Sequence, residues 1–401
     1  MQEHKKTQLR INLLEFFYFA GTFAGSFFPT VLKTSGMDSV AVATVMSINA
    51  SIGFVSPAIF ALIADKIGSP RKTFFFTLVT TSILWLGIPI SMNIKAGTFP
   101  VLVLFVLMGS FFRMPTGGLL DSWILQIQAA RPKVIYAHAR KYGSLGYAVM
   151  SMLSTLIVRW WGVGAIFYIL ILLVPLILFL GTKVGDPPAK EGLATAPAGE
   201  RNKLELGRIF KNYSIITHVL CLVVTWMPFT LSYMMLPYLA DAIGQDSSIL
   251  GTLFGVRALI EVPAFMLVPL LARKFKPQMI LPVCFGYYVV EEFLLAGTHT
   301  MGMLITIMMV SGLIYGIAVG TNINYVHSLA PPGLKTTVVT INAAANSAAN
   351  IIGNQIVGQV IKHAGIRVCY MVIGSMTAVA VCMMILFFYI GKKRNMPLLQ
   401  G

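Results

Sequence analysis

The chain has 401 residues, of which 57% are hydrophobic and only 11% carry a charge. Soluble globular proteins are about 45–50% apolar and about 25% charged, so this composition exceeds the needs of one buried core. It excludes a soluble enzyme, a disordered chain and a nucleic-acid-binding protein, and it predicts an all-α polytopic membrane protein. The net charge of +16 is explained by basic loops that orient membrane helices better than by a polyanionic partner.

Long apolar stretches follow one another along the whole chain. Because a bilayer span takes about 20 residues, they predict twelve transmembrane helices. The polar, basic segment MQEHKKTQLR at the start runs directly into the first stretch, which indicates a first span rather than a removed signal peptide. The expected spans are 11–32, 39–63, 73–94, 98–120, 141–160, 163–182, 213–239, 248–272, 279–298, 301–326, 334–361 and 367–390.

Lys and Arg residues are distributed unequally between the two sides of these spans. With the N-terminus inside, 23 of the 30 fall on the inner side and 5 on the outer side, and Arg113 and Arg257 lie within spans. Basic residues accumulate in cytoplasmic loops. The asymmetry therefore predicts a multi-pass protein of the plasma (inner) membrane with both termini in the cytoplasm.

The connection over residues 183–211 differs from the other loops because it is long, polar and rich in Pro, Ala and Gly. Such a composition is typical of a flexible linker, with or without a short surface helix. It separates six expected spans from six others. We therefore predict two six-helix halves, residues 1–182 and 212–401, joined by a cytoplasmic loop over 183–211, an arrangement found in duplicated transporters.

The loop after the second span contains the sharpest motif, ALIADKIGSPRK over residues 61–72. It resembles the signature Gly-x-x-x-Asp-(Arg/Lys)-x-Gly-(Arg/Lys)-(Arg/Lys) of the major facilitator superfamily, although Ala61 replaces the first Gly and two extra residues precede the basic pair. The resemblance implies that Asp65, with Arg71 and Lys72, takes part in gating by latching the two halves together. The alternative is an ordinary polar tight turn.

Four further stretches resemble one branch of that superfamily, the lactose-permease-like and phenylpropionate-permease-like proton symporters. They are FFYFAG at 16–21, LLD at 119–121, RKYGSLG at 140–146 and LAPPGLKTT at 329–337. The resemblance implies the major facilitator fold and proton-coupled transport, and we assign Asp121 and Arg140 to the gating set. The sugar-binding residues of lactose permease do not align with this chain, so lactose itself is not implied.

Charged residues inside the expected spans are the first candidates for function, because each costs at least ~2.5–3.5 kcal/mol at mid-membrane. Glu15 lies one turn into the first span, and Tyr18, Thr22 and Ser26 follow it at helical spacing on one face. This polar stripe predicts a face that lines a cavity. The alternative places Glu15 at the membrane interface, where water solvates it.

Arg113 lies deep in the fourth span and needs a carboxylate, a bound anion or water. Asp121 is about 12 Å further along the helix, too far for an easy pair. Glu15 is a possible partner from the first span. In the alternative hypothesis, the planar guanidinium binds a carboxylate of the substrate.

Arg257 and Glu261 are four residues apart in the eighth span, so the sequence predicts an ion pair along one helix face. Burial disfavours a charged carboxyl and a nearby Arg favours it, so such a group can take up a proton when its partner moves. A purely structural pair is the alternative. Glu291 and Glu292 point about 100° apart in the ninth span, and we expect them to occupy different environments.

Other polar and aromatic residues are candidates for substrate contact. We expect Tyr233 in the seventh span, and Asn322 and Tyr325 in the tenth, to face the cavity. The eleventh span has Asn342, Asn346, Asn350 and Asn354 at successive i+4 steps, which suits either helix packing or the wall of a substrate path.

Together these patterns predict a secondary active transporter that couples uptake of a small polar organic solute, such as a sugar, nucleoside or small organic acid, to protons by alternating access. The chain has no nucleotide-binding loop, metalloprotease motif or nucleophile elbow, so we expect no enzyme activity, no cofactor and no metal. Energy would come from a proton or sodium gradient. We expect a monomer in the lipid bilayer that binds no nucleic acid. A proton-driven drug exporter is the alternative, and a transporter-like sensor without flux is a remote one.

Overall fold

The computed structural model describes residues 2–97, 99–186, 212–329 and 335–394. Almost all of them are helical. The exceptions are the short connections and a β-hairpin with two residues in each strand. The elements are α1 (Gln2–Thr22), η1 (Phe23–Phe27), α2 (Phe28–Thr34), α3 (Ser39–Ile67), α4 (Pro70–Ser91), β1 (Lys95–Ala96), β2 (Phe99–Pro100), α5 (Val101–Ala130), α6 (Tyr136–Trp161), η2 (Val163–Phe167), α7 (Tyr168–Val184), α9 (Tyr213–Thr225), α10 (Met227–Ala242), α11 (Ile249–Ala272), α12 (Pro277–Ala296), α13 (Met301–Leu329) and α14 (Lys335–Lys393).

The described helices account for the expected membrane spans. Ten helical segments are long and apolar enough to cross a bilayer. The last of them contains two spans, because Gly365 has a φ of 83° and interrupts α14. Helix α6 supplies a further span whose first turns are polar. The all-α polytopic membrane fold predicted from the sequence is therefore confirmed.

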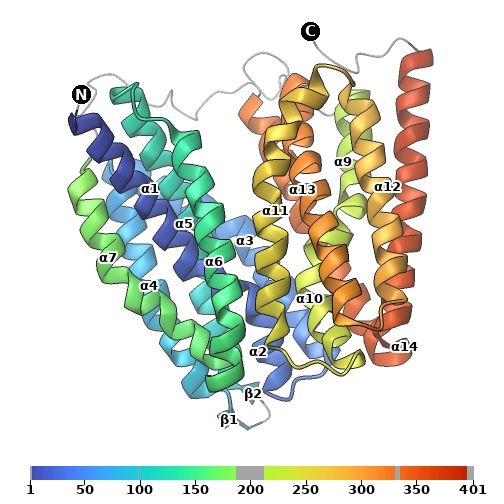
Figure 1. Cartoon of the computed structure of the whole chain (residues 1–401), viewed down its shortest axis with the longest axis horizontal. Coiled ribbons are helices and arrows are strands. Elements are labelled where there is room, and N and C mark those ends of the chain that lie inside the picture. The colour runs from blue at the N-terminus through green and yellow to red at the C-terminus, as the bar shows by residue number, and fades with distance from the viewer. Residues whose placement is uncertain (1, 98, 187–211, 330–334, 395–401) are drawn as a thin grey trace.

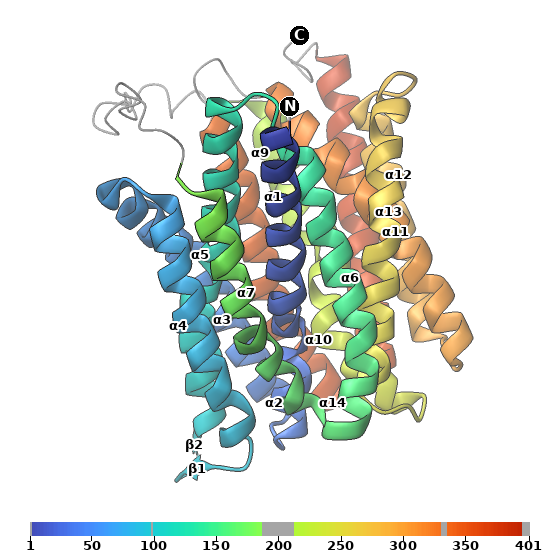
Figure 2. The ribbon, with the colours of Figure 1, turned by 60° about the vertical axis from the view of Figure 1, so that its left-hand side comes forward.

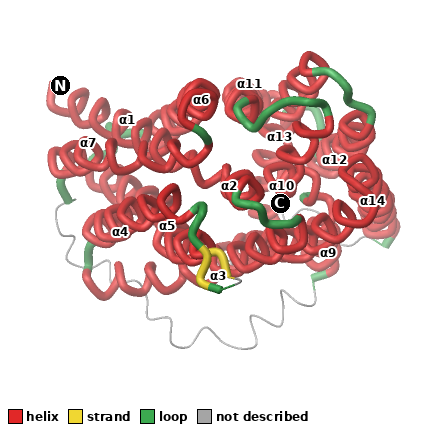
Figure 3. Tube along the Cα trace, turned by 90° about the horizontal axis from the view of Figure 1, so that it is seen from below, coloured by secondary structure: helices red, strands yellow, loops and turns green. Residues whose placement is uncertain are grey.

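The helices form two groups that stand side by side (Figure 1). Helices α1 to α7 make the first group, in which α1 packs on α6 and α7, and α4 packs on α5. Helices α9 to α14 make the second group, in which α11 packs on α13 and α12 packs on α14. The end-on view shows the same division (Figure 3). In the turned view the first group comes forward and partly covers the second (Figure 2). We call these groups the N-terminal and C-terminal halves.

The two ends of the bundle differ. The start of α1 and the end of α14 lie at one end, which we call the terminus side, and the β1–β2 hairpin lies at the other, which we call the far side (Figure 1). Neighbouring helices approach closely where one of them has a glycine. A Cβ at Gly146 would lie 2.1 Å from the carbonyl oxygen of Phe16, and one at Gly312 would lie 2.3 Å from that of Arg257. These two glycines bring α6 onto α1 and α13 onto α11.

Several expected boundaries were wrong. The fourth span extends to Ala130, and the fifth begins at Tyr136, so Arg140 belongs to a helix and not to a loop. The first span is not one continuous α-helix, because a 3₁₀ segment, η1, interrupts it. The seventh is divided at Trp226, and Pro228 stands in the first turn of α10, where its missing N–H is tolerated. Of the predicted linker 183–211, residues 187–211 lie outside the described residues.

Polar contacts between the halves gather on the far side. Lys33 of α2 pairs with Asp241 of α10, and Lys362 of α14 lies 3.2 Å from Asp38, which caps α3. We call these four residues the far-side latch. Next to it, Ser39 Oγ donates a hydrogen bond of 2.8 Å to the carbonyl oxygen of Gly358.

Glycines also bring the two halves together on this side. A Cβ at Gly251 of α11 would lie 2.4 Å from the carbonyl oxygen of Ser151 in α6. A Cβ at Gly358 of α14 would lie 2.4 Å from Cβ of Ala43 in α3. Since no real Cβ is accommodated at such distances, both interfaces depend on the absence of a side chain. The molecule is therefore tightly closed on the far side.

Candidate transport site

The guanidinium of Arg113 lies directly against the break in the first span. A Cβ at Gly25 of η1 would lie 2.7 to 2.8 Å from three atoms of that guanidinium. Its Nε has no hydrogen-bond partner. The ion pairs between described residues do not include Arg113, so the pair with Glu15 considered above is not formed. Gly25 of the 3₁₀ segment thus leaves the space that the Arg113 guanidinium occupies. No carboxylate among the described residues forms an ion pair with this guanidinium. We call this place the seat of Arg113.

Glu15 is completely buried, and neither of its carboxylate oxygens has a hydrogen-bond partner. It does not lie at a solvated interface, so that alternative is wrong. Helix α6 approaches it closely, because a Cβ at Gly143 would lie 3.0 Å from Glu15 Oε2. The charges of Arg140 and Asp121 act on the carboxyl, while the Arg140 guanidinium stacks 4.3 Å from the ring centroid of Phe19.

The structure therefore brings together three residues that the sequence assigned to two different roles. Glu15 on α1, Asp121 on α5 and Arg140 on α6 form one electrostatic cluster inside the N-terminal half. We call them the Glu15 cluster. Arg140 also acts electrostatically on Glu261 of α11. Its charge therefore acts on carboxyls of both halves, although Arg257 acts more strongly on Glu261.

The polar side chains of the first span do not all contact the same neighbouring helix. Tyr18 is buried and its hydroxyl shares a 2.6 Å hydrogen bond with Thr116 of α5. Thr22 donates to the carbonyl oxygen of Tyr18. Ser26 lies beyond the start of η1 and shares a 2.8 Å hydrogen bond with the Tyr147 hydroxyl of α6. The change from α- to 3₁₀-helix rotates the later positions, and the sequence spacing does not reveal it.

Aromatic side chains meet where the halves join in the middle of the molecule. Phe27 of η1 makes an edge contact with Phe254 of α11, with 5.4 Å between ring centroids. Tyr233 of α10 packs on the same Phe254 at 4.8 Å. Tyr147 of the N-terminal half and Tyr233 of the C-terminal half interact electrostatically across the junction between the halves. Tyr147, which carries no sequence signal, thus stands between Ser26 and Tyr233.

Arg257 is buried, and its hydrogen bond and its aromatic contact are both with α10. Its Nη1 donates a 2.6 Å hydrogen bond to Ser232 Oγ of α10, and its guanidinium lies 4.1 Å from the ring centroid of Phe229. The ion pairs between described residues do not include Arg257 with Glu261, so the predicted pair is wrong. Helical spacing permits that pair, but α10 offers the guanidinium a hydroxyl and an aromatic face together.

Glu291 and Glu292 of α12 are both buried, so neither lies at an interface. Both interact electrostatically with Arg257. Glu292 also packs against α14, because a Cβ built at Gly374 of α14 would lie 3.0 Å from the Cβ of Glu292. The two adjacent carboxyls therefore serve different contacts although both are in the protein interior.

Asn322 and Tyr325 lie within the packing of α9, α13 and α14. Asn322 Oδ1 is 2.8 Å from His218 Nε2, and Asn322 Nδ2 donates to Asn342 Oδ1 at 3.2 Å. Tyr325 is fully buried between His218 and Phe388. The structure does not bring these two residues to Tyr233. His218 completes this network and was not singled out from the sequence.

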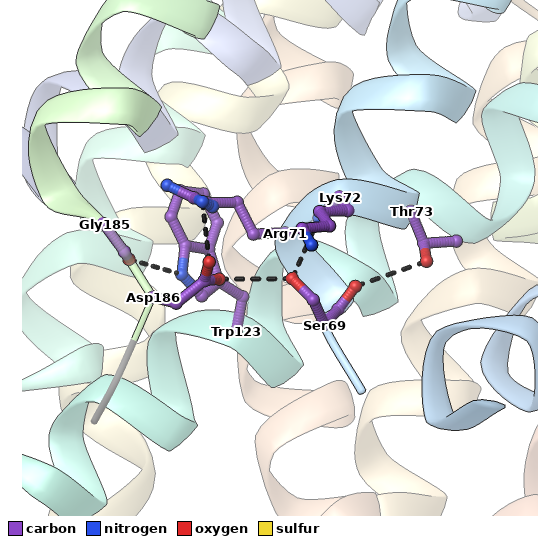
Figure 4. A network of polar contacts seen from close by, with 7 residues as sticks. All are labelled: Ser69, Arg71, Lys72, Thr73, Trp123, Gly185 and Asp186. Carbon is purple, nitrogen blue, oxygen red and sulfur yellow. Dashed lines mark hydrogen bonds and ion pairs between the residues drawn. The ribbon is translucent and has the colours of Figure 1, made fainter. Parts of the chain in front are cut away.

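The motif after the second span forms a network within the N-terminal half (Figure 4). Arg71 pairs with Asp186 at 2.6 Å, and Ser69 Oγ donates to the same carboxylate at 3.2 Å. Trp123 Nε1 donates to the carbonyl oxygen of Gly185 at 3.1 Å. The motif thereby fastens the start of α4 to the end of α7. Asp65 and Lys72 are exposed on the terminus side.

Comparison with known proteins agrees with this arrangement. A model of the MFS_1-like family matches residues 8–372. The chain belongs to the MFS_1-like family. It is therefore a transporter of the major facilitator type and an integral multi-pass membrane protein. No curated protein matches the chain significantly by sequence.

Solved transporters share the fold of this MFS_1-like chain at low sequence identity. A mutant form of the nucleoside transporter NupG has a TM-score of 0.81 and 16% identity, over 95% of this chain and 100% of that one. A D-xylose-proton symporter has a TM-score of 0.75 and 15% identity, over 95% and 97%. An auto-inhibited POT-family peptide transporter has 0.72 and 12%, over 97% of both.

Three features of the site were not found from the sequence. The seat of Arg113 depends on Gly25, the junction between the halves uses Tyr147, and Arg257 is held by Ser232. Each belongs to a contact between two different elements. Only Gly25 carried a local signal, as a small residue inside a span that already held a buried acid.

Proposed function

We propose that this transporter couples the uptake of a small polar organic solute to protons by alternating access. Residues 1–182 and 212–401 are the two moving halves, and 183–211 is the cytoplasmic linker. The terminus side is cytoplasmic, because 23 of the 30 Lys and Arg residues were assigned to that side. The protein works as a monomer in the inner membrane and requires no cofactor.

One observation carries the proposal. A buried carboxyl without a hydrogen-bond partner, Glu15, and a guanidinium without a carboxylate, Arg113, occur in the same half. An uncompensated charge inside a membrane protein is costly, and here neither residue neutralises the other. A proton on Glu15 and a polar or anionic group of the substrate at Arg113 supply the two missing partners.

Arg140 supplies a physical link between protonation and movement. Its charge acts on Glu15 in its own half and on Glu261 in the other half. When the halves rock, the distance from Arg140 to Glu261 changes while its distance to Glu15 is kept by the packing of α6 on α1. The stability of a charged Glu261 therefore depends on the conformation, which is the requirement for proton coupling.

The aromatic side chains at the junction between the halves and beside it in the C-terminal half suit a ring-bearing substrate. Tyr147 and Tyr233 offer hydroxyls, and the rings of Phe229 and Tyr315 stack at 3.6 Å. Such a surface suits sugars and nucleosides, whereas Arg113 adds affinity for a carboxylate. The substrate classes are therefore a sugar, a nucleoside or a small organic acid. The titles of two solved neighbours, a nucleoside transporter and a D-xylose-proton symporter, lie within this range.

Proton flux in proteoliposomes loaded with a pH dye tests the function. Sugars, nucleosides and small organic acids are added one at a time without sodium, and the effective substrate should acidify the lumen. Glu15→Gln and Glu261→Gln should abolish this acidification, while the exposed Asp246→Asn control should retain it. A requirement for sodium, or flux only with lipophilic cations, would contradict proton-coupled uptake and favour sodium coupling or drug export.

The seat of Arg113 provides a second test with a matched pair of variants. Gly25→Ala places a methyl group 2.7 to 2.8 Å from the guanidinium and must displace it, so uptake should fall at least about tenfold. Gly118→Ala adds the same methyl group to α5, where nothing lies within 4 Å, and uptake should be unchanged. Equal uptake by both variants would remove Arg113 from the substrate site.

A further inference from the structure

Helix α6 of the N-terminal half packs against α11 of the C-terminal half, and we call this contact the seam between the halves. The helices are antiparallel and in regular register. Gly251 packs on the backbone of Ser151, and one turn further Gly255 packs on the backbone of Ala148, where a Cβ would lie 2.9 Å from the carbonyl oxygen. This register places Leu145 opposite Leu259 in the next turn, and Lys141 opposite Pro263 in the turn after that.

The helices have separated at those two turns. A groove of about 370 Å³ occupies the position that the register assigns to the next contacts. Its walls are Lys141, Tyr142 and Leu145 from α6, and Leu259, Val262 and Pro263 from α11. Figure 1 shows the two helices close together on the far side and apart on the terminus side. The groove is therefore the open continuation of a tight helix–helix contact.

The chemistry of the groove is amphipathic. Leu145 and Leu259 are 37% and 42% exposed, although each stands in a membrane-spanning helix. Among the described residues that line it, the single cation is Lys141, whose Nζ lies 5.5 Å from the ring centroid of Tyr142. Arg273 and Lys274 follow directly after the end of α11 at Ala272, about 15 Å beyond Pro263 toward the terminus side, and are exposed. An apolar slot thus leads to a basic rim.

We propose that this groove binds an anionic phospholipid from the leaflet on the terminus side. One acyl chain lies between Leu145 and Leu259, and the phosphate pairs with Lys141. A lipid is the occupant because the slot opens in the membrane-spanning part of the chain, where acyl chains are the available apolar partner. An anionic headgroup is selected because the rim is basic, as in other basic pockets between membrane helices.

The bound lipid has a consequence for the transport cycle. The register of α6 on α11 can continue through Leu145 and Leu259 only when the groove is empty. An acyl chain in the slot therefore acts as a wedge that favours separation of the halves on the terminus side. This effect is independent of the substrate and of the proton, so it stands or falls separately from the proposed function.

Native mass spectrometry of the purified, delipidated full-length chain tests the binding. Phosphatidylglycerol and phosphatidylcholine with identical acyl chains are titrated separately. The first phosphatidylglycerol should bind at least about fivefold more tightly than phosphatidylcholine, and Lys141→Gln should remove this preference. Lys95→Gln removes an equal charge from an exposed position on the far side, away from the groove and its rim, and should retain it. Equal binding of both lipids, or equal loss in both variants, would overturn the proposal.

A second variant tests the apolar part of the groove independently of the charge of Lys141. Leu259→Trp fills the slot from the lipid-exposed face and should lower the affinity of the first lipid for both headgroups. Met266→Trp, on an exposed position of the same helix outside the groove, should leave the affinity unchanged. Circular dichroism of each variant verifies that the helical fold is retained. Undiminished lipid binding by Leu259→Trp would show that the lipid lies elsewhere.

Discussion

The far side and the terminus side of the seam between the halves are built differently. On the far side, glycines bring backbones into contact and the latch adds two ion pairs, Lys33 with Asp241 and Asp38 with Lys362. On the terminus side, the network around Arg71 and Asp186 stays within one half, and α6 and α11 enclose a groove.

This contrast indicates which conformation the structure represents. The far side is closed and the terminus side is the open end, which matches one state of the alternating-access cycle that we propose. The far-side contacts must break for the opposite state to form. Their combined strength therefore has to remain small enough for the cycle to reverse them, and the surface ion pairs of the latch suit this because each contributes little.

The largest effect is expected from forcing the glycine contact apart. Gly251→Ala places a methyl group 2.4 Å from the Ser151 carbonyl oxygen, so α6 and α11 must separate on the far side. A cysteine introduced at buried Ala43, in a background lacking the four native cysteines, should then react at least about tenfold faster with an impermeant maleimide. Gly286→Ala, which meets nothing within 4 Å, is the control. Unchanged labelling would mean that the seam is not closed by this contact.

A smaller opening should follow from removing the latch. Lys33→Gln combined with Lys362→Gln eliminates both ion pairs but leaves the glycine contacts in place. Because exposed pairs contribute about 0–1 kcal/mol each, labelling of the same Ala43→Cys reporter should increase a few-fold. The control is Lys95→Gln, an exposed residue of the far-side hairpin. A response as large as that of Gly251→Ala would assign the closure to the charges instead.

Asp38 allows the capping and pairing contributions to be separated by pH. The backbone N–H of Ala41, and then Lys362, hold the pKa of Asp38 below its ordinary value. Its contribution to stability is therefore present above about pH 3.9 and is lost only as the pH falls through the lowered value. Asp38→Asn keeps the helix cap, whereas Asp38→Ala should cost about 1 kcal/mol more.

The thermal unfolding midpoints of wild type, Asp38→Asn and Asp38→Ala measure these contributions. The difference between wild type and Asp38→Asn should stay constant from pH 8 to pH 5 and shrink below about pH 4. If it changed between pH 7 and pH 6, another titrating group would control the latch. Equal midpoints for the two variants would exclude a capping role.

The smallest effect is expected from the terminus-side network. Asp186→Asn removes the partner of Arg71 and weakens the tie between α4 and α7, both of which belong to the N-terminal half. Transport should decrease no more than about twofold, because the pair is partly exposed and does not join the halves. Lys133→Gln is the control in a neighbouring loop. A loss above tenfold would show that Arg71 and Asp186 control gating directly.

Several features followed directly from the residues. The all-α polytopic membrane class and the membership of the major facilitator superfamily depend on local hydropathy and on the motif at 61–72, and both are confirmed. The burial of Glu15 also agrees with its position one turn into an apolar stretch. The roles of the candidate residues in binding, coupling and gating stay predictions.

Side-chain partners could not be read in the same way. The i+4 spacing of Arg257 and Glu261 predicts a pair, but Ser232 and Phe229 of another helix hold the guanidinium instead. Gly25 is visible in the sequence as a small residue of the first span, but that local feature does not indicate that Arg113 lies against it. In both cases the decisive contact comes from a different element, α10 for Arg257 and η1 for Arg113.

The sequence by itself determined that the chain crosses the membrane many times, because the bilayer imposes one requirement on each segment separately. It also determined which residues bring charge into the apolar region. Only the tertiary structure decided which charges meet, which remain without a partner and which side of the seam is closed. These outcomes depend on helix–helix register and glycine contacts between distant segments, and no local pattern encodes them.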